Sequence, residues 1–222
     1  MRPFGELYAR AARRKGGEAA LEALIPRPKS AAELAAIGDD RWLSQMAKSV
    51  FQAGFVWRVV EHKWPAFERA FQAFDPHAVA YLSDDELDGM LADASLIRHH
   101  AKLRAVRDNA RFLLDLAAEH GSAARYFAAS PRGAYVDLLL TLKRRGSRLG
   151  GHAAQYCLRR MGVDSFILTR DVVAVLVDEG VVAREPTSQR DLRAVQAAFD
   201  DWCEQSGRGL TSVSRVLALS ID

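Results

Sequence analysis

The sequence predicts an all-α protein for two reasons. Apolar residues recur at helical spacing, most clearly over 101–118, where Leu103, Val106 and Ala110 share one face. No segment of useful length alternates between apolar and polar residues as a half-buried strand does; the only β-rich piece, 180–183, is too short to outweigh the helices. We therefore expect an all-α fold, a helical bundle.

Composition sets limits on the kind of protein. The 222 residues are 49% hydrophobic, enough to form a full core, and the net charge of +3 permits a nucleic-acid partner without requiring one. Cys157 and Cys203 lie far apart in the sequence and form no CxxC pair, so no cysteine-based zinc site or disulfide framework is expected. The chain shows no signal-peptide core and no apolar run that spans a bilayer, which favours a cytoplasmic location without membrane contact.

Residues 1–40 predict an N-terminal arm of short helices packed on the main body. The first ends near Gly16, and the second, 18–24, stops before Pro26. Ser30 and Glu33 have the spacing of a capping box and begin a third helix that ends at Gly38.

Residues 41–182 predict the helical core, and 183–222 a C-terminal helical extension. Asp40 is expected to cap the first core helix, which stops at Gln52–Gly54, and Ser83 with Glu86 forms a second capping box. Asp75-Pro76 has the pattern of a helix start. The other helical segments expected from the pattern are 55–60, 66–74, 101–118, 136–142, 153–161, 172–177, 189–205 and 210–219.

The segment 143–155 is the most informative part of the chain. It places three glycines and four basic residues between two helices, and the helix that begins at His152 or Ala153 points free N–H groups into the turn. Such a turn binds anions, phosphate above all, so we interpret it as a helix–hairpin–helix element that grips a nucleic-acid backbone. An ordinary glycine-rich turn in a bundle is the alternative interpretation. The expected phosphate-binding residues are Lys143, Arg144, Arg148, Gly150, Gly151 and His152.

Three further stretches carry a family resemblance. They are Gln52–Trp57, Phe74-Asp75-Pro76, and Leu96–Leu103 followed by Asn109-Ala110-Arg111. In this order and at this spacing they resemble the DNA-3-methyladenine glycosylase I family of the helix-hairpin-helix DNA glycosylase superfamily. The resemblance covers 41–182 and places the basic hairpin where the family grips DNA.

The resemblance implies a base-excision repair enzyme that hydrolyses the N-glycosidic bond of alkylated purines such as 3-methyladenine, flipping the damaged nucleotide out of double-stranded DNA. It implies a fold with a cleft for the flipped base, a monomer and no cofactor. Trp57 is then the platform for the base, Phe55 the wedge that fills the duplex, and Gly54 the point of close backbone approach, while Tyr8 of the arm is a weaker match to the pocket. Without the family, Trp57 and Phe55 are interpreted as core aromatics.

The chain departs from the family at the pocket and at the ends. Ser49 stands where the family has a glutamate that contacts the damaged base. Ala12 and Asp171 stand near positions of a zinc clip made of Cys and His, so no structural zinc is expected. Thr169 is nearest to the aspartate that the wider superfamily often uses, which leaves Asp171 as the candidate acid.

Other residues of the family-like stretches have simpler expected roles. His99 and His100 are expected to hold a loop against the pocket. The helix after the hairpin, 153–157, contains no lysine for a Schiff base, so lyase activity is not expected.

Two functions from different classes remain open. The first is a monofunctional glycosylase, because an N-alkylated purine is a good leaving group and needs no protonation. The second is a catalytically silent relative that binds damaged DNA, motivated by Ser49 and by the missing zinc clip. A helical protein–protein module is what remains if neither binds DNA.

Overall fold

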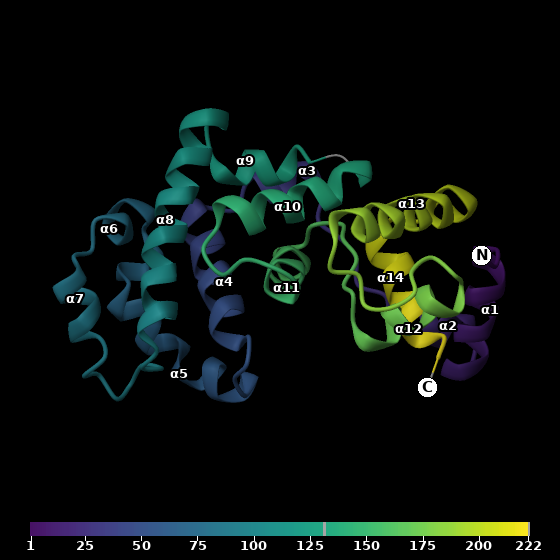
Figure 1. Ribbon diagram of the computed structural model, residues 1–222, viewed down its shortest axis with the longest axis horizontal. Helices are drawn as coiled ribbons and strands as arrows, with labels where there is room; N and C mark the ends of the chain where they lie inside the picture. Colours follow the sequence, from purple (N-terminus) through teal and green to yellow (C-terminus); the bar gives the residue numbers. More distant parts are fainter. Residues whose placement is uncertain (131, 222) are drawn as a thin grey trace. The chain divides into compact units, whose positions relative to one another are not determined.

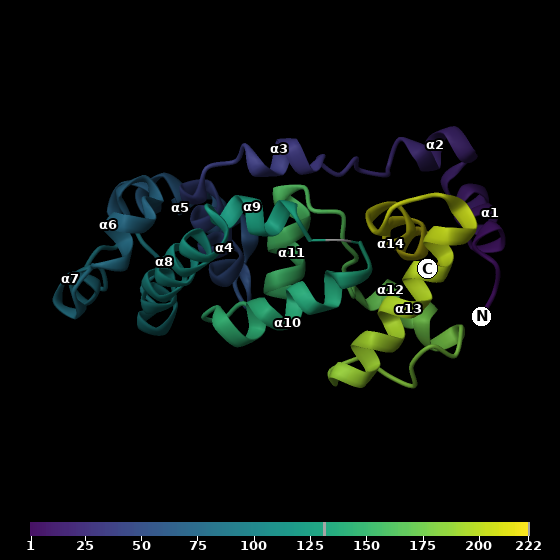
Figure 2. The same cartoon turned by 90° about the horizontal axis from the view of Figure 1, so that it is seen from above.

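A computed structural model describes residues 1–130 and 132–221, and within them every regular element is a helix (Figures 1 and 2), which confirms the all-α class. The chain forms two compact units. Unit 1 comprises Met1–Lys29, Ser130–Asp137 and Gly162–Asp222, and unit 2 comprises Ser30–Ala129 and Leu138–Met161. The expected core, 41–182, therefore contributes residues to both units, and the division into arm, core and extension stays a prediction.

Unit 2 is built around α4, which packs against α5, α8 and α11. The long helix expected over 101–118 is α8, and the two helices expected around the glycine-rich turn are α10 and α11. The elements of unit 2 are α3 (Ala31–Ala35), α4 (Asp39–Gln52), α5 (Trp57–Ala70), η1 (Gln72–Phe74), α6 (Pro76–Ala80), α7 (Asp84–Gly89), α8 (His100–His120), α9 (Ala123–Ala128), most of α10 (Tyr135–Arg145) and α11 (His152–Met161).

The capping signals act largely as expected. Both capping boxes form, at Ser30 and at Ser83, and the Asp75 carboxylate accepts from the backbone N–H of His77, the second residue of α6. The role of Asp40 was predicted wrongly: the N-cap of α4 is Gly38, two residues earlier, and the helix begins at Asp39. The Asp39 carboxylate instead accepts hydrogen bonds from the first two N–H groups of α9.

The helix expected over 66–74 is not separate. α5 runs without interruption from Trp57 to Ala70 although it contains Pro65. Proline removes one backbone hydrogen-bond donor, and packing of α5 on α4 stabilises the helix despite this loss. The chain then turns through Gln72, Ala73 and Phe74, all with positive φ. Three consecutive non-glycine residues in this region are strained, so neighbouring structure must hold the turn.

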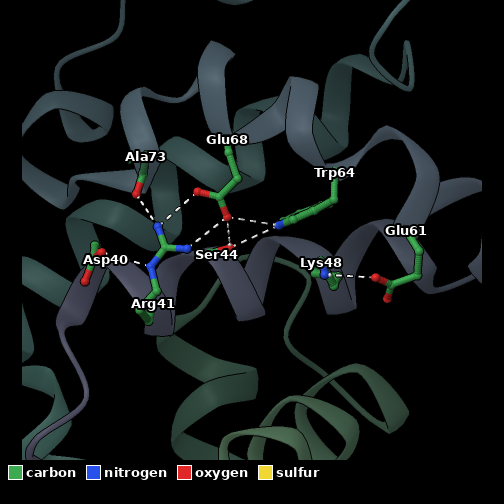
Figure 3. A network of polar contacts seen from close by, with 8 residues as sticks. All are labelled: Asp40, Arg41, Ser44, Lys48, Glu61, Trp64, Glu68 and Ala73. Carbon is green, nitrogen blue, oxygen red and sulfur yellow. Dashed lines mark hydrogen bonds and ion pairs between the residues drawn. The ribbon is translucent and has the colours of Figure 1, made fainter.

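A polar network between α4 and α5 holds this turn (Figure 3). Arg41 donates two parallel hydrogen bonds of 3.0 Å to the Glu68 carboxylate and a third to the carbonyl of Ala73. Glu68 also accepts from Ser44 and from the indole N–H of Trp64. Burial alone would raise the pKa of Glu68, but the hydrogen bonds from Arg41 and Ser44 outweigh it and lower that pKa.

Aromatic rings fill the space below the network. Trp64 stacks on Phe67 with 5.1 Å between ring centroids and on Phe74 with 5.4 Å, and Phe71 stacks on Phe74 at 5.5 Å. The edge of Phe51, near the end of α4, meets Phe67 at 4.6 Å. This packing fixes the C-terminal end of α4 relative to α5, where the candidate site lies.

Unit 1 joins the two ends of the chain. α1 (Phe4–Lys15) packs against α13 (Gln189–Ser206) and α14 (Leu210–Leu219). The indole N–H of Trp202 donates to the carbonyl of Arg2 at 3.1 Å, and the N–H of Phe4 donates to the Gln205 side chain at 2.7 Å. The remaining elements of the unit are α2 (Glu18–Glu22), η2 (Arg132–Ala134) and α12 (Arg170–Asp178), with the first residues of α10.

We expect Glu68→Gln to lower the free energy of unfolding at pH 7 by about 1–2 kcal/mol, because it removes the charge that Arg41 pairs with. The folded pKa of Glu68 is lowered, so its contribution is present above the ordinary value of 4.5 and is lost as the pH falls through the lowered value. Denaturant unfolding at several pH values checks this: the difference between wild type and variant should shrink on acidification. A constant difference, or one equal to that of the exposed control Asp108→Asn, contradicts it.

Candidate nucleobase pocket and DNA-contact hairpin

The loop between α4 and α5 exposes an unusual run of apolar side chains. Phe55, Val56 and Trp57 are 39%, 67% and 45% exposed, and Gly54 just before them has a φ of 76°, which glycine adopts without strain. Contiguous exposed apolar side chains of this size usually mark a binding surface. The expected wedge, Phe55, lies in this run, but Val56 is more exposed and sequence reasoning missed it.

Lys102 of α8 holds the start of this loop through hydrogen bonds to its backbone. Its ammonium donates to the carbonyl of Ala53 at 2.6 Å and to that of Phe51 at 3.3 Å, and it lies 4.5 Å from the ring centroid of Phe55. Burial, and then the nearby charge of Arg148, lower the pKa of Lys102. The ring of His99 approaches Phe55 edge-on at 6.5 Å, in keeping with the expected loop-holding role.

A cavity of about 200 Å³ opens beside this loop, entirely within unit 2. Its walls come from the end of α4, the loop and first residue of α5, and one face of α11. The lining residues are Ser49, Gln52, Ala53, Gly54, Trp57, His152, Ala153, Tyr156 and Arg160. The structure therefore brings together four residues that the sequence selected separately: Ser49, Gly54, Trp57 and His152.

Ser49, expected from the resemblance to stand in place of a glutamate, is a buried neutral group. Its hydroxyl accepts from the Gln45 side chain at 3.0 Å and takes part in a hydrogen bond with the Cys157 thiol. Burial raises the pKa of Cys157 to about 12, only partly offset by Ser49 and Arg160, so the thiol stays protonated and is no nucleophile. Among the described residues, no carboxylate lines the cavity.

The cavity instead contains a cation, Arg160. The centre of its guanidinium lies 4.6 Å from the Trp57 ring centroid and 5.5 Å from that of Tyr156, and these two rings meet edge to face at 5.2 Å. The guanidinium also donates to the side-chain oxygen of Gln52, whose amide nitrogen in turn donates to Glu61 at 2.9 Å. Arg160, Tyr156 and Gln52 were all missed from the sequence.

The hairpin between α10 and α11 is held by a buried amide. Asn109 of α8 donates to the carbonyl of Ser147 at 3.0 Å and accepts from its N–H at 2.8 Å, a two-bond pairing with the backbone. Gly146 is required by space, since a Cβ there would lie 2.7 Å from the carbonyl oxygen of Leu142. Arg148 and Gly151 follow with positive φ, which turns the chain into α11.

The hairpin presents unpaired cations and free amides. Lys143, Arg144 and Arg148 are exposed and form no ion pair within residues 1–130 and 132–221, whereas Arg145 is held by the Glu119 carboxylate. In the same residues, the backbone N–H groups of Gly150 and Gly151 have no internal acceptor. These are the features that an anion-binding turn requires.

The remaining candidates lie in unit 1. The hydroxyl of Tyr8 donates to Glu22 at 2.7 Å, and Arg208 lies over its ring. Asp171 lies in the first turn of α12, and Thr169 caps that helix. The expected pocket role of Tyr8 and the acid role of Asp171 therefore stay predictions.

Two features are absent from the part of the chain that the structure describes. No group of three or more His, Cys, Asp or Glu side chains is placed to hold a metal ion. No helix there has the length and apolar character that a bilayer span requires.

Solved structures identify the fold. The chain is similar to Staphylococcus aureus 3-methyladenine DNA glycosylase I, with 20% identity, a TM-score of 0.52, and coverage of 63% of this chain and 81% of that one. It is similar over more of its length to the Methanocaldococcus jannaschii 8-oxoguanine DNA glycosylase, with 15% identity, a TM-score of 0.57, and coverage of 94% and 90%. The fold is therefore that of the helical DNA glycosylases.

Sequence comparison finds similarity to one family. The model of the methyladenine glycosylase family matches residues 35–137. DNA-3-methyladenine glycosylase 1 of Escherichia coli K12 is 35% identical over 65 residues, and the Haemophilus influenzae DNA-3-methyladenine glycosylase is 38% identical over 63. These matches cover 29% and 28% of this chain, and the chain spans about a third of the length of these curated relatives, 35% and 34%. They confirm the resemblance: over residues 35–137 the chain is similar to the methyladenine glycosylase family.

We expect Asn109→Leu to loosen the hairpin, because it leaves the N–H and carbonyl of Ser147 without partners at a cost of about 1–3 kcal/mol. Hydrogen exchange followed by mass spectrometry or NMR should show faster exchange at Ser147, while Asp108→Ala on the exposed side of α8 leaves it unchanged. Unaltered protection of Ser147 in Asn109→Leu would show that another contact holds the turn.

Proposed function

We propose that this protein is a DNA glycosylase that flips an alkylated purine out of duplex DNA and hydrolyses its N-glycosidic bond. The observation that carries the proposal is the half-exposed indole of Trp57, which forms one wall of a cavity in the same unit as the basic hairpin. An indole sealed in the core would have removed the platform. Hairpin amides already bonded within the protein would have removed the phosphate site.

In this proposal each part of the site has its own step. The hairpin cations and the amides of Gly150 and Gly151 hold backbone phosphates, because free N–H groups at a helix start favour anions. The exposed side chains of Phe55 and Val56 enter the duplex and fill the space that the flipped nucleotide leaves. Unstacking a base costs a few kcal/mol, which contacts in the pocket and by the wedge offset.

Hydrolysis then needs little from the protein beyond positioning. A water oxygen forms a bond to the sugar C1′ and loses a proton to solvent, the C1′–N bond breaks, and its electron pair passes to the departing base. A purine alkylated at a ring nitrogen accepts that pair readily because it is already cationic. Holding the base and the water in place is then the main contribution of the site.

A catalytically silent role in binding damaged DNA is the second candidate. It is favoured by one observation: none of the described lining residues of the cavity is acidic, and Ser49 is the residue expected in place of the glutamate. General-base assistance is typically worth about 10²–10⁴-fold, so a protein without it is a slow enzyme or a binder. Base release under single-turnover conditions separates the two.

Trp57→Ala should abolish or strongly reduce release of alkylated purines, neutral or cationic, from damaged duplex DNA, because it removes the platform for the flipped base. Chromatography of the released bases measures this, with Tyr81→Ala as the control, since Tyr81 is another exposed aromatic that does not line the cavity. Equal release by both variants contradicts the proposed site. No release by the wild type, with tight binding to the same DNA, favours the silent role.

Binding to duplex DNA should depend steeply on salt. Each phosphate contact contributes about 0.9 to the slope of log K against log salt, so Arg148→Ala and Lys143→Ala should each reduce the slope by roughly that amount. Fluorescence anisotropy at several salt concentrations gives the slopes. Arg104→Ala, whose side chain pairs with Asp84, is the control and should leave the slope unchanged. A slope that is flat in the wild type removes both DNA-binding functions.

A further inference from the structure

Arg160 places a permanent positive charge in the pocket that is proposed to receive the base. A guanidinium stays protonated throughout the physiological pH range and carries five N–H donors. Among the described residues, the side chain of Gln52 is its one hydrogen-bond acceptor. Most of its donors are therefore available to a group that enters the cavity.

The position of this cation is fixed by a chain of side chains. Gln52 is almost fully buried, and its amide nitrogen is bound to Glu61, which turns its oxygen toward Arg160. Lys48 pairs with the other oxygen of Glu61 at 3.1 Å. Arg160, Glu61 and Lys48 carry charges of +1, −1 and +1, so together they leave a net charge of +1 at the pocket wall.

The positive charge of Arg160 affects which damaged base binds in the pocket. A purine alkylated at a ring nitrogen carries a positive charge, and beside Trp57 it meets a guanidinium that already lies over the indole. The two cations repel each other, and no carboxylate among the lining residues compensates. A neutral purine with a lone pair at its edge instead gains a charge-assisted hydrogen bond from Arg160.

The same charge assists departure of a neutral base. When the C1′–N bond of a neutral purine breaks, its electron pair leaves negative charge on the base, and the base later takes up the proton that the attacking water releases. A cation aimed at this site stabilises that developing charge in the transition state. A base that is already cationic needs no such help.

We propose that Arg160 determines substrate choice, so that the pocket takes alkylated purines that are electrically neutral and present an acceptor nitrogen or oxygen, such as 1,N⁶-ethenoadenine, in preference to cationic N-alkylpurines. This inference rests on the proposed glycosylase function and narrows its substrate class. It makes Arg160 a residue that contacts the base, with Gln52 and Glu61 as positioning residues.

The test compares two duplexes that differ only in the lesion, one with 1,N⁶-ethenoadenine and one with cationic 7-methylguanine. Binding and single-turnover base release are measured for the wild type, Arg160→Gln and Arg160→Lys. Gln keeps a hydrogen-bond donor without the charge, and Lys keeps the charge without the planar fork. Circular dichroism and thermal unfolding confirm that each variant is folded.

The wild type should favour the ethenoadenine duplex over the 7-methylguanine duplex by about tenfold or more, given the strength of close charge pairs at partly exposed sites. Arg160→Gln should reduce this ratio by about tenfold, and Arg160→Lys should retain most of it. A ratio unchanged in Arg160→Gln, or a wild type that favours the cationic lesion, overturns the inference and leaves the glycosylase function standing. A wild type that distinguishes neither lesion duplex from undamaged DNA overturns both.

Discussion

The packing of α11 against α4 is the constraint on which the rest of the site depends. α4 brings Ser49 and Gln52 to the pocket, and α11 brings Tyr156 and Arg160. The N-terminal end of α11 also forms one side of the basic hairpin. One helix pair therefore fixes both the place where a base would be held and the place where its phosphates would be bound. Rigid elements hold such geometry better than loops do.

Two buried polar groups keep this arrangement in register. Asn109 pairs with the backbone of Ser147 and ties the hairpin to α8, while Gln52 connects Glu61 of α5 to Arg160 of α11. Both are amides, which donate and accept at once: Asn109 satisfies both backbone groups of Ser147, and Gln52 bonds to groups on two helices. The turn after α5 is held instead by the ion pair of Arg41 and Glu68.

Much of the fold follows from the sequence because local signals agree with tertiary packing. The capping boxes at Ser30 and Ser83 form where the sequence predicts them, and α8 covers the segment expected to be helical over 101–118. The left-handed turn around Ala73 has no such signal: its residues are ordinary, and Arg41, 32 positions earlier in the chain, holds it. Each unit is likewise built from segments that are far apart in the sequence, and hydrophobic periodicity does not predict the contacts that bring them together.

The candidate site was only partly predictable. Trp57 and the hairpin glycines were found through motifs, and the position of Ser49 through a family pattern. Arg160 lacked a motif, and an arginine near the end of a helix usually faces solvent. One usable signal was its spacing: His152, Tyr156 and Arg160 recur every four residues, which places them on the face of α11 that lines the cavity.

The proposed function requires that a base enters the cavity beside Trp57. Disulfide trapping tests this most directly, using Ala153→Cys at the cavity wall and duplex DNA in which one purine carries a short thiol tether; the native cysteines are buried. We expect a cross-linked complex with Ala153→Cys and none with Tyr81→Cys on the exposed surface. Equal cross-linking at both positions, or none at Ala153→Cys under conditions where the DNA is bound, would contradict the account.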